Sequence, residues 1–124
     1  MGCVGGFYKN YDKCLYYLKQ YKGVIKKNNY IYMSPKEKLA LENNANYYKK
    51  QLNSTLQKMN RDAKYKDQCQ QLKELNEIYQ NFLALESERN RTYLIENNQG
   101  NNELRRNEVF IYDNLNKIEE KCKI

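Results

Sequence analysis

The residues best suited to carry chemistry stand at the start of the sequence, where Gly2 and Cys3 follow Met1. Removal of the methionine frees the amine of Gly2 for N-myristoylation, and a neighbouring cysteine can then be S-acylated at a membrane. The myristoylation motif has Ser or Thr at its sixth position, but this chain has Gly6 there and so departs from the motif. We state lipidation of Gly2 and Cys3 as a hypothesis. Its alternative is a small-residue N-terminus that packs closely on a partner.

The spacing of the four cysteines does not indicate a metal site. They stand at positions 3, 14, 69 and 122, with no Cys-x-x-Cys pair and no histidine anywhere in the chain. Zinc sites normally combine closely spaced Cys and His ligands, so we expect no metal site. We expect the thiols to be mostly reduced, with some of them serving as small core residues, because free cysteine is among the most buried residue types.

Enzymatic chemistry is not expected. Histidine, the usual general acid or base near neutral pH, is absent. Neighbouring carboxylates, such as Glu86 with Glu88 and Glu119 with Glu120, are more simply explained as solvated helix faces. No motif places two groups in complementary catalytic roles. The sequence therefore predicts a non-catalytic protein with no catalytic residues and no bound cofactor.

Helical periodicity governs most of the chain. A first helix is predicted over 7–27, after a short Gly-rich tip at 1–6, because its apolar residues recur at steps of three and four. A last helix is predicted over 103–122 from the same spacing. Gly100 is expected to end the preceding helix, since glycine favours the left-handed conformation found there.

The middle of the chain contains the best-defined helix start. Ser34, Pro35 and Glu37 fit the N-cap, first and third positions of a helix, and the serine and glutamate can form a capping box. No Pro or Gly interrupts 35–98, so one long helix is possible there. The apolar spacing falters near 60–68, which would allow a hairpin of two helices instead. We keep both alternatives open.

The predicted fold is therefore all-α, with a single domain over 1–124. We expect an elongated helical hairpin or coiled-coil-like arrangement of three to four helices. Its apolar stripes are narrow, which suits coiled coils or docking into a partner's groove. The residues predicted to form partner-packing stripes are Phe7, Tyr11, Cys14, Leu18, Tyr21, Ile25, Leu72, Leu75, Tyr79, Phe82, Leu104, Ile111, Leu115 and Ile118.

Composition points to a small core and a protein partner. Only 26 of the 124 residues are Leu, Ile, Val or Phe, whereas 13 are Tyr. Tyrosine is enriched at protein interfaces because its ring is apolar and its hydroxyl can form hydrogen bonds. The shortage of aliphatic residues suggests that a partner covers part of the apolar surface.

Charge divides the chain into unlike halves. Residues 1–66 carry 14 Lys or Arg against 4 Asp or Glu, whereas residues 67–124 carry 8 against 11. The halves could pack together, or the basic half could bind an acidic protein or an anionic membrane surface. Lysine exceeds arginine 17 to 5, and no nucleic-acid motif is present, so we expect no specific nucleic-acid binding.

The function expected from these observations is that of a structural accessory subunit in a large multiprotein assembly. Abundant Asn, Lys and Tyr resemble the composition of proteins from AT-rich protist genomes, which suggests a lineage-specific subunit of a mitochondrial respiratory complex, associated with the inner membrane. The alternatives are an N-terminally acylated peripheral membrane adaptor and a ciliary or cytoskeletal scaffold in the cytoplasm.

Overall fold

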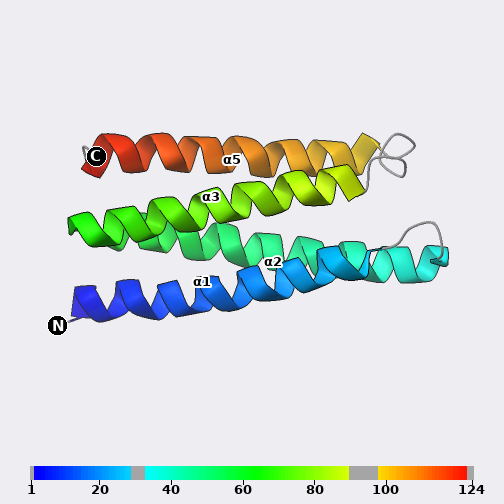
Figure 1. Cartoon of the computed structure of the whole chain (residues 1–124), viewed down its shortest axis with the longest axis horizontal. Helices are drawn as coiled ribbons and strands as arrows, with labels where there is room; N and C mark the ends of the chain where they lie inside the picture. Colours follow the sequence, from blue (N-terminus) through cyan, green and yellow to red (C-terminus); the bar gives the residue numbers. More distant parts are fainter. Residues whose placement is uncertain (1, 29–32, 90–97, 123–124) are drawn as a thin grey trace.

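A computed structural model describes residues 2–28, 33–89 and 98–122, nearly all of which are helical. In this part of the chain there are four helices, which lie side by side along one long axis (Figure 1). The predicted all-α, elongated helical arrangement is confirmed. The helices are α1 (Gly2–Lys27), α2 (Pro35–Asp62), α3 (Lys66–Arg89) and α5 (Asn98–Cys122).

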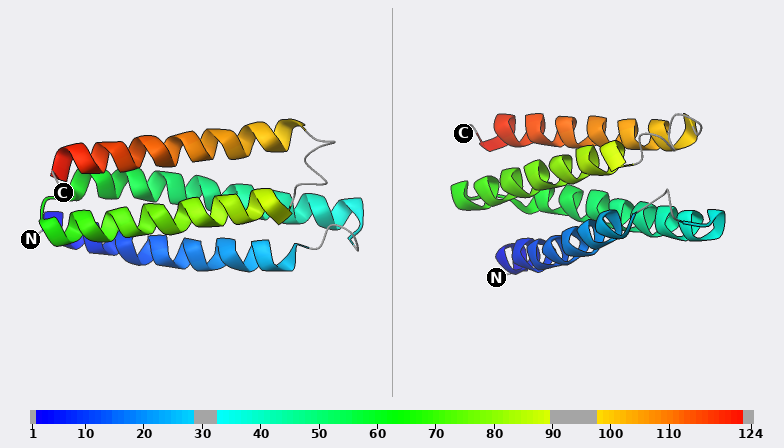
Figure 2. Two further views of the ribbon diagram at one scale, coloured as in Figure 1. Left: turned by 45° about the horizontal axis from the view of Figure 1, so that its top comes forward. Right: turned by 45° about the vertical axis from the view of Figure 1, so that its right-hand side comes forward.

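The helices form two antiparallel hairpins that stack on each other. Helix α1 packs chiefly on α2, and α3 packs chiefly on α5. The hairpins meet where α1 lies against α3 and where α2 lies against α5. Both views of Figure 2 show that α1 and α3 run in the same direction, opposite to α2 and α5. The basic hairpin α1–α2 therefore faces the more acidic hairpin α3–α5.

The predicted start of α2 is confirmed by its capping contacts. The hydroxyl of Ser34 accepts a hydrogen bond from the backbone N–H of Glu37 at 3.2 Å, and Pro35 occupies the first helical turn. The carboxylate of Glu37 accepts from the Ser34 hydroxyl, also at 3.2 Å. The glutamate thus orients the capping hydroxyl, whereas a complete capping box would bring it to the cap's backbone N–H.

The middle segment is broken into two helices, α2 and α3, so the alternative of one continuous helix over 35–98 is wrong. Helix α2 ends at Asp62, where buried Ala63 takes an extended conformation with ψ near 124°. The side-chain oxygen of buried Gln68 accepts from the backbone N–H groups of Lys64 and Tyr65 at 2.9 and 3.3 Å. A side chain thereby satisfies donors in a turn that has neither Gly nor Pro.

Two other predicted boundaries differ from the structure. Helix α1 begins at Gly2 rather than at residue 7, because the glycines of the tip continue the helix instead of ending it. Helix α5 begins at Asn98, before the predicted start at 103, and Gly100 lies within its first turn. The expectation that Gly100 ends a preceding helix is therefore wrong, since α3 already ends at Arg89.

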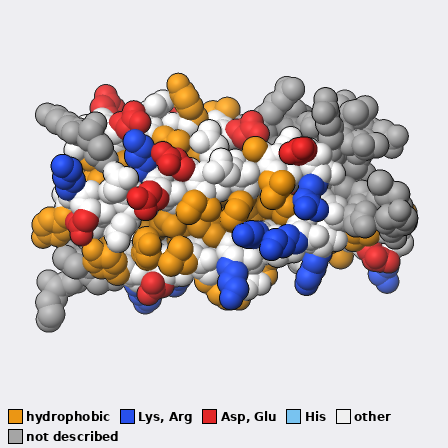
Figure 3. Space-filling model, in the orientation of Figure 1, with side chains coloured by type: hydrophobic (Ala, Val, Ile, Leu, Met, Phe, Trp, Pro, Cys, Tyr) orange, Lys and Arg blue, Asp and Glu red, His pale blue; other side chains and the backbone are white. Residues whose placement is uncertain are grey.

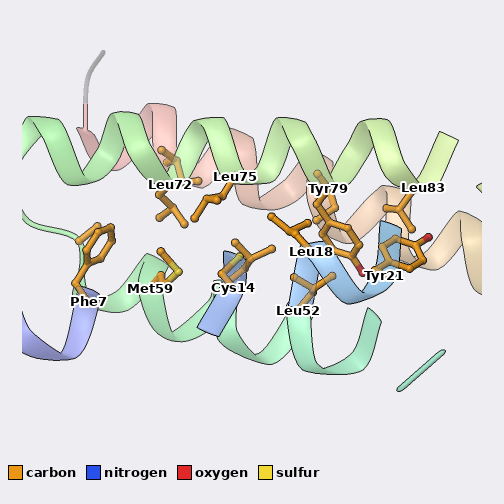
Figure 4. Packing of buried hydrophobic residues seen from close by; sticks show 14 of the residues in the cluster. Phe7, Cys14, Leu18, Tyr21, Leu52, Met59, Leu72, Leu75, Tyr79 and Leu83 are labelled. Carbon is orange, nitrogen blue, oxygen red and sulfur yellow. The ribbon is translucent and has the colours of Figure 1, made fainter. Parts of the chain in front are cut away.

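The core lies between the two hairpins and runs along the long axis. Phe7 and Met59 pack at one end, and Tyr21, Tyr79 and Leu83 lie toward the other (Figure 4). The rings of Tyr21 and Tyr79 meet edge to face, with centroids 6.0 Å apart. Such contacts between aromatic rings add to the stabilisation that burial alone provides.

Candidate functional site

The two hairpins are joined by a buried ion pair. Glu86 of α3 accepts a hydrogen bond at 2.6 Å from the hydroxyl of Tyr21 in α1. The same carboxylate oxygen accepts from the ammonium of Lys49 in α2 at 3.0 Å. The side chains of Lys49 and Glu86 are only 4% and 8% exposed, so each charge depends on the other for compensation.

A second set of polar contacts continues this cluster toward α5. The hydroxyl of Tyr79 lies 2.9 Å from Oδ1 of Asn53, and 3.3 Å from both Oδ1 of Asn107 and the backbone oxygen of Lys49. A phenol has one proton, so it can donate to only one of these oxygens at a time. The amide of Asn53 donates to Oδ1 of Asn107 at 2.8 Å. Together the two sets form a polar cluster that links all four described helices.

Burial controls the ionisation of the groups in this region. Desolvation, and then the negative charge and hydrogen bond of Glu86, raise the pKa of Tyr21 well above its ordinary value. Tyr21 therefore stays a neutral donor toward the Glu86 carboxylate throughout the neutral range. Desolvation also raises the pKa of the Cys14 thiol in the core to about 12. Both groups are suited to holding structure rather than to exchanging protons.

The outer surface of the basic hairpin carries connected tyrosine rings. Tyr16 contacts Tyr17 within α1, Tyr17 reaches Tyr48 of α2, and Tyr48 contacts Tyr47, with centroid separations of 5.5, 6.5 and 5.3 Å. Tyr16 and Tyr47 are 56% and 54% exposed, whereas the middle two rings are partly buried. We call these four residues the tyrosine surface.

The tyrosine surface lies in the half of the chain that carries excess positive charge. Lys13 precedes Tyr16 by about one helical turn, and Lys50 follows Tyr47 at the same distance, so both lie on nearby parts of their helices. Both lysines are exposed. An aromatic surface with cations at its border is suited to a partner that offers carboxylates around an apolar centre.

A shallow groove of about 350 Å³ separates part of α2 from α5. Arg61 and Lys117 contribute cations to its lining and Asp113 contributes a carboxylate, with Phe110 as the apolar wall. Asn114, also part of the lining, is buried, and its side-chain nitrogen has no hydrogen-bond partner in the described residues. The groove lacks a paired nucleophile and base, so its arrangement does not indicate catalysis.

The residues of the predicted partner-packing stripes face one another inside the chain. Most are fully buried, and Tyr11, Phe82 and Leu115 are partly buried against the same core. The side chain of Leu104 lies outside the described residues. These side chains are therefore already covered within the folded chain, and their role toward a partner stays a prediction. The buried stripe residues are Phe7, Cys14, Leu18, Tyr21, Ile25, Leu72, Leu75, Tyr79, Ile111 and Ile118.

The lipidation hypothesis also stays a prediction. Gly2 and Cys3 belong to the first turn of α1, and their side chains lie outside the described residues. Within the described part of the chain, no helix is both long and apolar enough to cross a membrane. The same part holds no group of three or more Cys, Asp or Glu side chains placed to bind a metal ion.

The expectation of mostly reduced thiols is wrong for two of the four cysteines. Cys69, in the first turn of α3, forms a disulfide with Cys122 in the last turn of α5. The two are 53 positions apart, and only the folding of α3 and α5 into a hairpin brings them together. Cys14 is free and buried, as expected for a cysteine used as a core residue.

Sequence reasoning missed the buried polar residues. Glu86 was expected on a solvated face and is buried, whereas Glu88 is exposed as predicted. Lys49 continues the three-and-four spacing of the buried residues in α2, and Asn107 does so in α5. This spacing could have identified Lys49 and Asn107 as buried, but a pattern that counts only apolar residues omits both.

Comparison with known proteins finds no protein-family model, no curated protein and no solved structure that matches this chain.

Proposed function

We propose that this chain is a non-catalytic accessory subunit that binds an acidic partner protein in a larger assembly through its tyrosine surface. The observation that carries the proposal is the run of four connected rings across α1 and α2, with Tyr16 and Tyr47 more than half exposed. Most residues of the apolar stripes are buried in the core, so these exposed rings provide the aromatic surface that a partner could contact.

Tyrosine is well suited to this role. It brings a large contact area and loses little conformational freedom on binding, because it has only two side-chain torsions. The partly buried Tyr17 and Tyr48 hold the outer rings in place, which lowers the cost of ordering them. The excess of lysine in residues 1–66 favours an acidic partner and speeds the encounter with it.

The disulfide supports a location in an oxidising compartment. Disulfides between Cys residues persist in such compartments and are rare where glutathione and thioredoxin keep thiols reduced. For a subunit of a mitochondrial respiratory assembly, the proposal therefore favours the side of the inner membrane that faces away from the matrix. The composition typical of AT-rich genomes supports a lineage-specific subunit of this kind.

The test is affinity purification of the tagged full-length chain from its native cells, with identification of the proteins that accompany it. We expect the wild-type chain to copurify with an assembly, and the double variant Tyr16→Ala/Tyr47→Ala to lose it. The matched control is Tyr65→Ala/Tyr112→Ala, which removes two rings that are 56% and 62% exposed elsewhere. Equal recovery of partners by the two double variants would contradict the proposal.

A further inference from the structure

The seam between α1 and α3 forms a second surface, distinct from the tyrosine surface. The ammonium of Lys22 in α1 lies 6.0 Å from the ring centroid of Phe82 in α3, and the Tyr21 ring lies 6.3 Å from the same ring. These contacts fix the register of the two parallel helices, with Lys22 beside Phe82. Positions before Lys22 in α1 therefore lie beside positions before Phe82 in α3.

Apolar side chains line this seam on both helices. Tyr8 and Leu15 precede Lys22 by fourteen and seven residues, which places all three on one side of α1. Ile78 precedes Phe82 by one turn and lies on the same side of α3. Tyr8, Leu15 and Ile78 are 36%, 43% and 39% exposed. We call these three residues, together with Phe82, the α1–α3 face.

The charges beside this face are divided between its two ends. Lys19, Lys22 and Lys26 are exposed in the later half of α1. Asp67 and Glu74 are exposed in the first half of α3. Because the helices run parallel, the lysines border one end and these carboxylates border the other. Figure 3 shows the apolar band on this side of the molecule, with basic side chains beside its right-hand part and acidic side chains beside its left-hand part.

We propose that a second copy of this chain covers the α1–α3 face, with the two copies antiparallel about a two-fold axis. A two-fold axis through the middle of the face, near Leu15 and Ile78, exchanges the ends and lays α1 of one copy over α3 of the other. Isologous pairing of this kind needs a self-complementary surface. The lysines at one end and the carboxylates at the other provide one, with apolar side chains at the centre.

The arrangement makes a specific pairing of charges. The register places Lys22 and Lys26 of one copy over Glu74 and Asp67 of the second copy, and the symmetry repeats the pairing. An acidic helix of another protein could use the lysines but would leave Asp67 and Glu74 against its own carboxylates. The proposal does not rest on the proposed function, since the tyrosine surface extends toward α2 through Tyr17, on the flank of α1 away from α3.

Sedimentation velocity of the full, oxidised chain tests the dimer. At roughly 100 µM, enough to populate a dimer of micromolar affinity, we expect the wild type to be mainly dimeric. Leu15→Asp should weaken the dimer by roughly tenfold or more, since it buries a carboxylate at the centre of the interface. The matched control Val109→Asp changes a side chain that is 60% exposed on α5 and should leave association unchanged.

Charge exchange distinguishes a second copy from any other occupant. We expect two double variants to be monomeric when each is alone: Lys22→Glu/Lys26→Glu and Asp67→Lys/Glu74→Lys. In a dimer of either variant with itself, both symmetry-related pairings would bring charges of the same sign together. An equal mixture should restore a mixed dimer, in which every pairing is again opposite. Circular dichroism checks that each variant remains helical. A monomeric wild type, or a mixture that stays monomeric, overturns the proposal.

Discussion

Lys49 shows at the scale of one residue how the two hairpins are held in register. It occupies a position that the spacing of α2 assigns to the core, between buried Ala45 and Leu52. Its charge is compensated by Glu86 on the facing hairpin. Such a pair adds little net stability compared with apolar residues of the same shape, but a broken pair is costly. Any arrangement of the hairpins that separated the two side chains would leave two buried charges alone.

Replacing Lys49 by methionine tests this account. Lys49→Met should lower the free energy of unfolding by about 3 kcal/mol, because Glu86 then keeps a buried charge with only the Tyr21 hydroxyl to compensate it. Lys49→Met/Glu86→Gln should recover a large part of that loss. The control Lys50→Met, on an exposed neighbour, should change stability by less than about 0.5 kcal/mol in urea unfolding. Additive losses in the double variant would argue against coupling.

Burial of Cys14 should make the free energy of unfolding fall as pH rises through the alkaline range. Burial raises the pKa of the folded thiol from 9.0 to about 12, so the unfolded chain loses this proton first as pH rises. The contribution is fully present below about pH 9 and is lost progressively as pH rises toward 12. Between neutral pH and about pH 10.5, the loss of this contribution should lower the free energy of unfolding by about 2 kcal/mol. Urea unfolding of Cys14→Ala should show a pH dependence smaller by that amount, and an unchanged dependence would exclude this assignment.

At the scale of the elements, the sequence predicted the start of α2 better than its end. Ser34 and Pro35 are local signals, and the structure uses both. The turn after Asp62 could not be predicted in the same way, because its backbone donors are satisfied by Gln68, a side chain of the following helix. Glutamine has no strong preference for turns, so only the folded arrangement shows its role.

A substitution at Gln68 tests the turn. Gln68→Ala should destabilise the fold by about 1 to 3 kcal/mol, because the N–H groups of Lys64 and Tyr65 lose their acceptor. The matched control is Gln70→Ala, on an exposed side chain two positions along the same helix. Thermal unfolding followed by circular dichroism measures both. Equal losses in the two variants would show that the acceptor at position 68 is replaceable by water.

The buried polar residues of α5 explain why its packing could not be predicted in detail. Asn107 and Asn114 alternate with Ile111 and Ile118 on the buried face, whereas Leu115, which belongs to the predicted stripe, is only partly buried. The periodicity of the helix was correct, and Ile111 and Ile118 are buried as predicted, but the two buried asparagines were missed. Asparagine is uncommon in a core, so the apolar pattern alone selects the neighbouring residues.

At the scale of the whole molecule, the disulfide closes the α3–α5 hairpin at one end. The cross-link between Cys69 and Cys122 encloses a segment of 53 positions. In the chain-entropy account, a loop of this length contributes about 4 kcal/mol. A reductant, or the variant Cys122→Ser, should therefore lower the free energy of unfolding by about that amount. Hydrogen exchange should quicken most in α5, whereas an unchanged unfolding midpoint under reductant would refute the expectation.

The short turn between the two hairpins offers a place where the chain could be split into two fragments. The disulfide lies wholly within the second hairpin, and a turn of only three residues separates α2 from α3. Cleaving that turn would yield two fragments of opposite net charge, each containing the two helices of one hairpin. Each would carry its own half of the Lys49–Glu86 and Asn53–Asn107 pairings. Mixing them offers a split reporter, in which recovery of the buried contacts signals that two fused proteins have met.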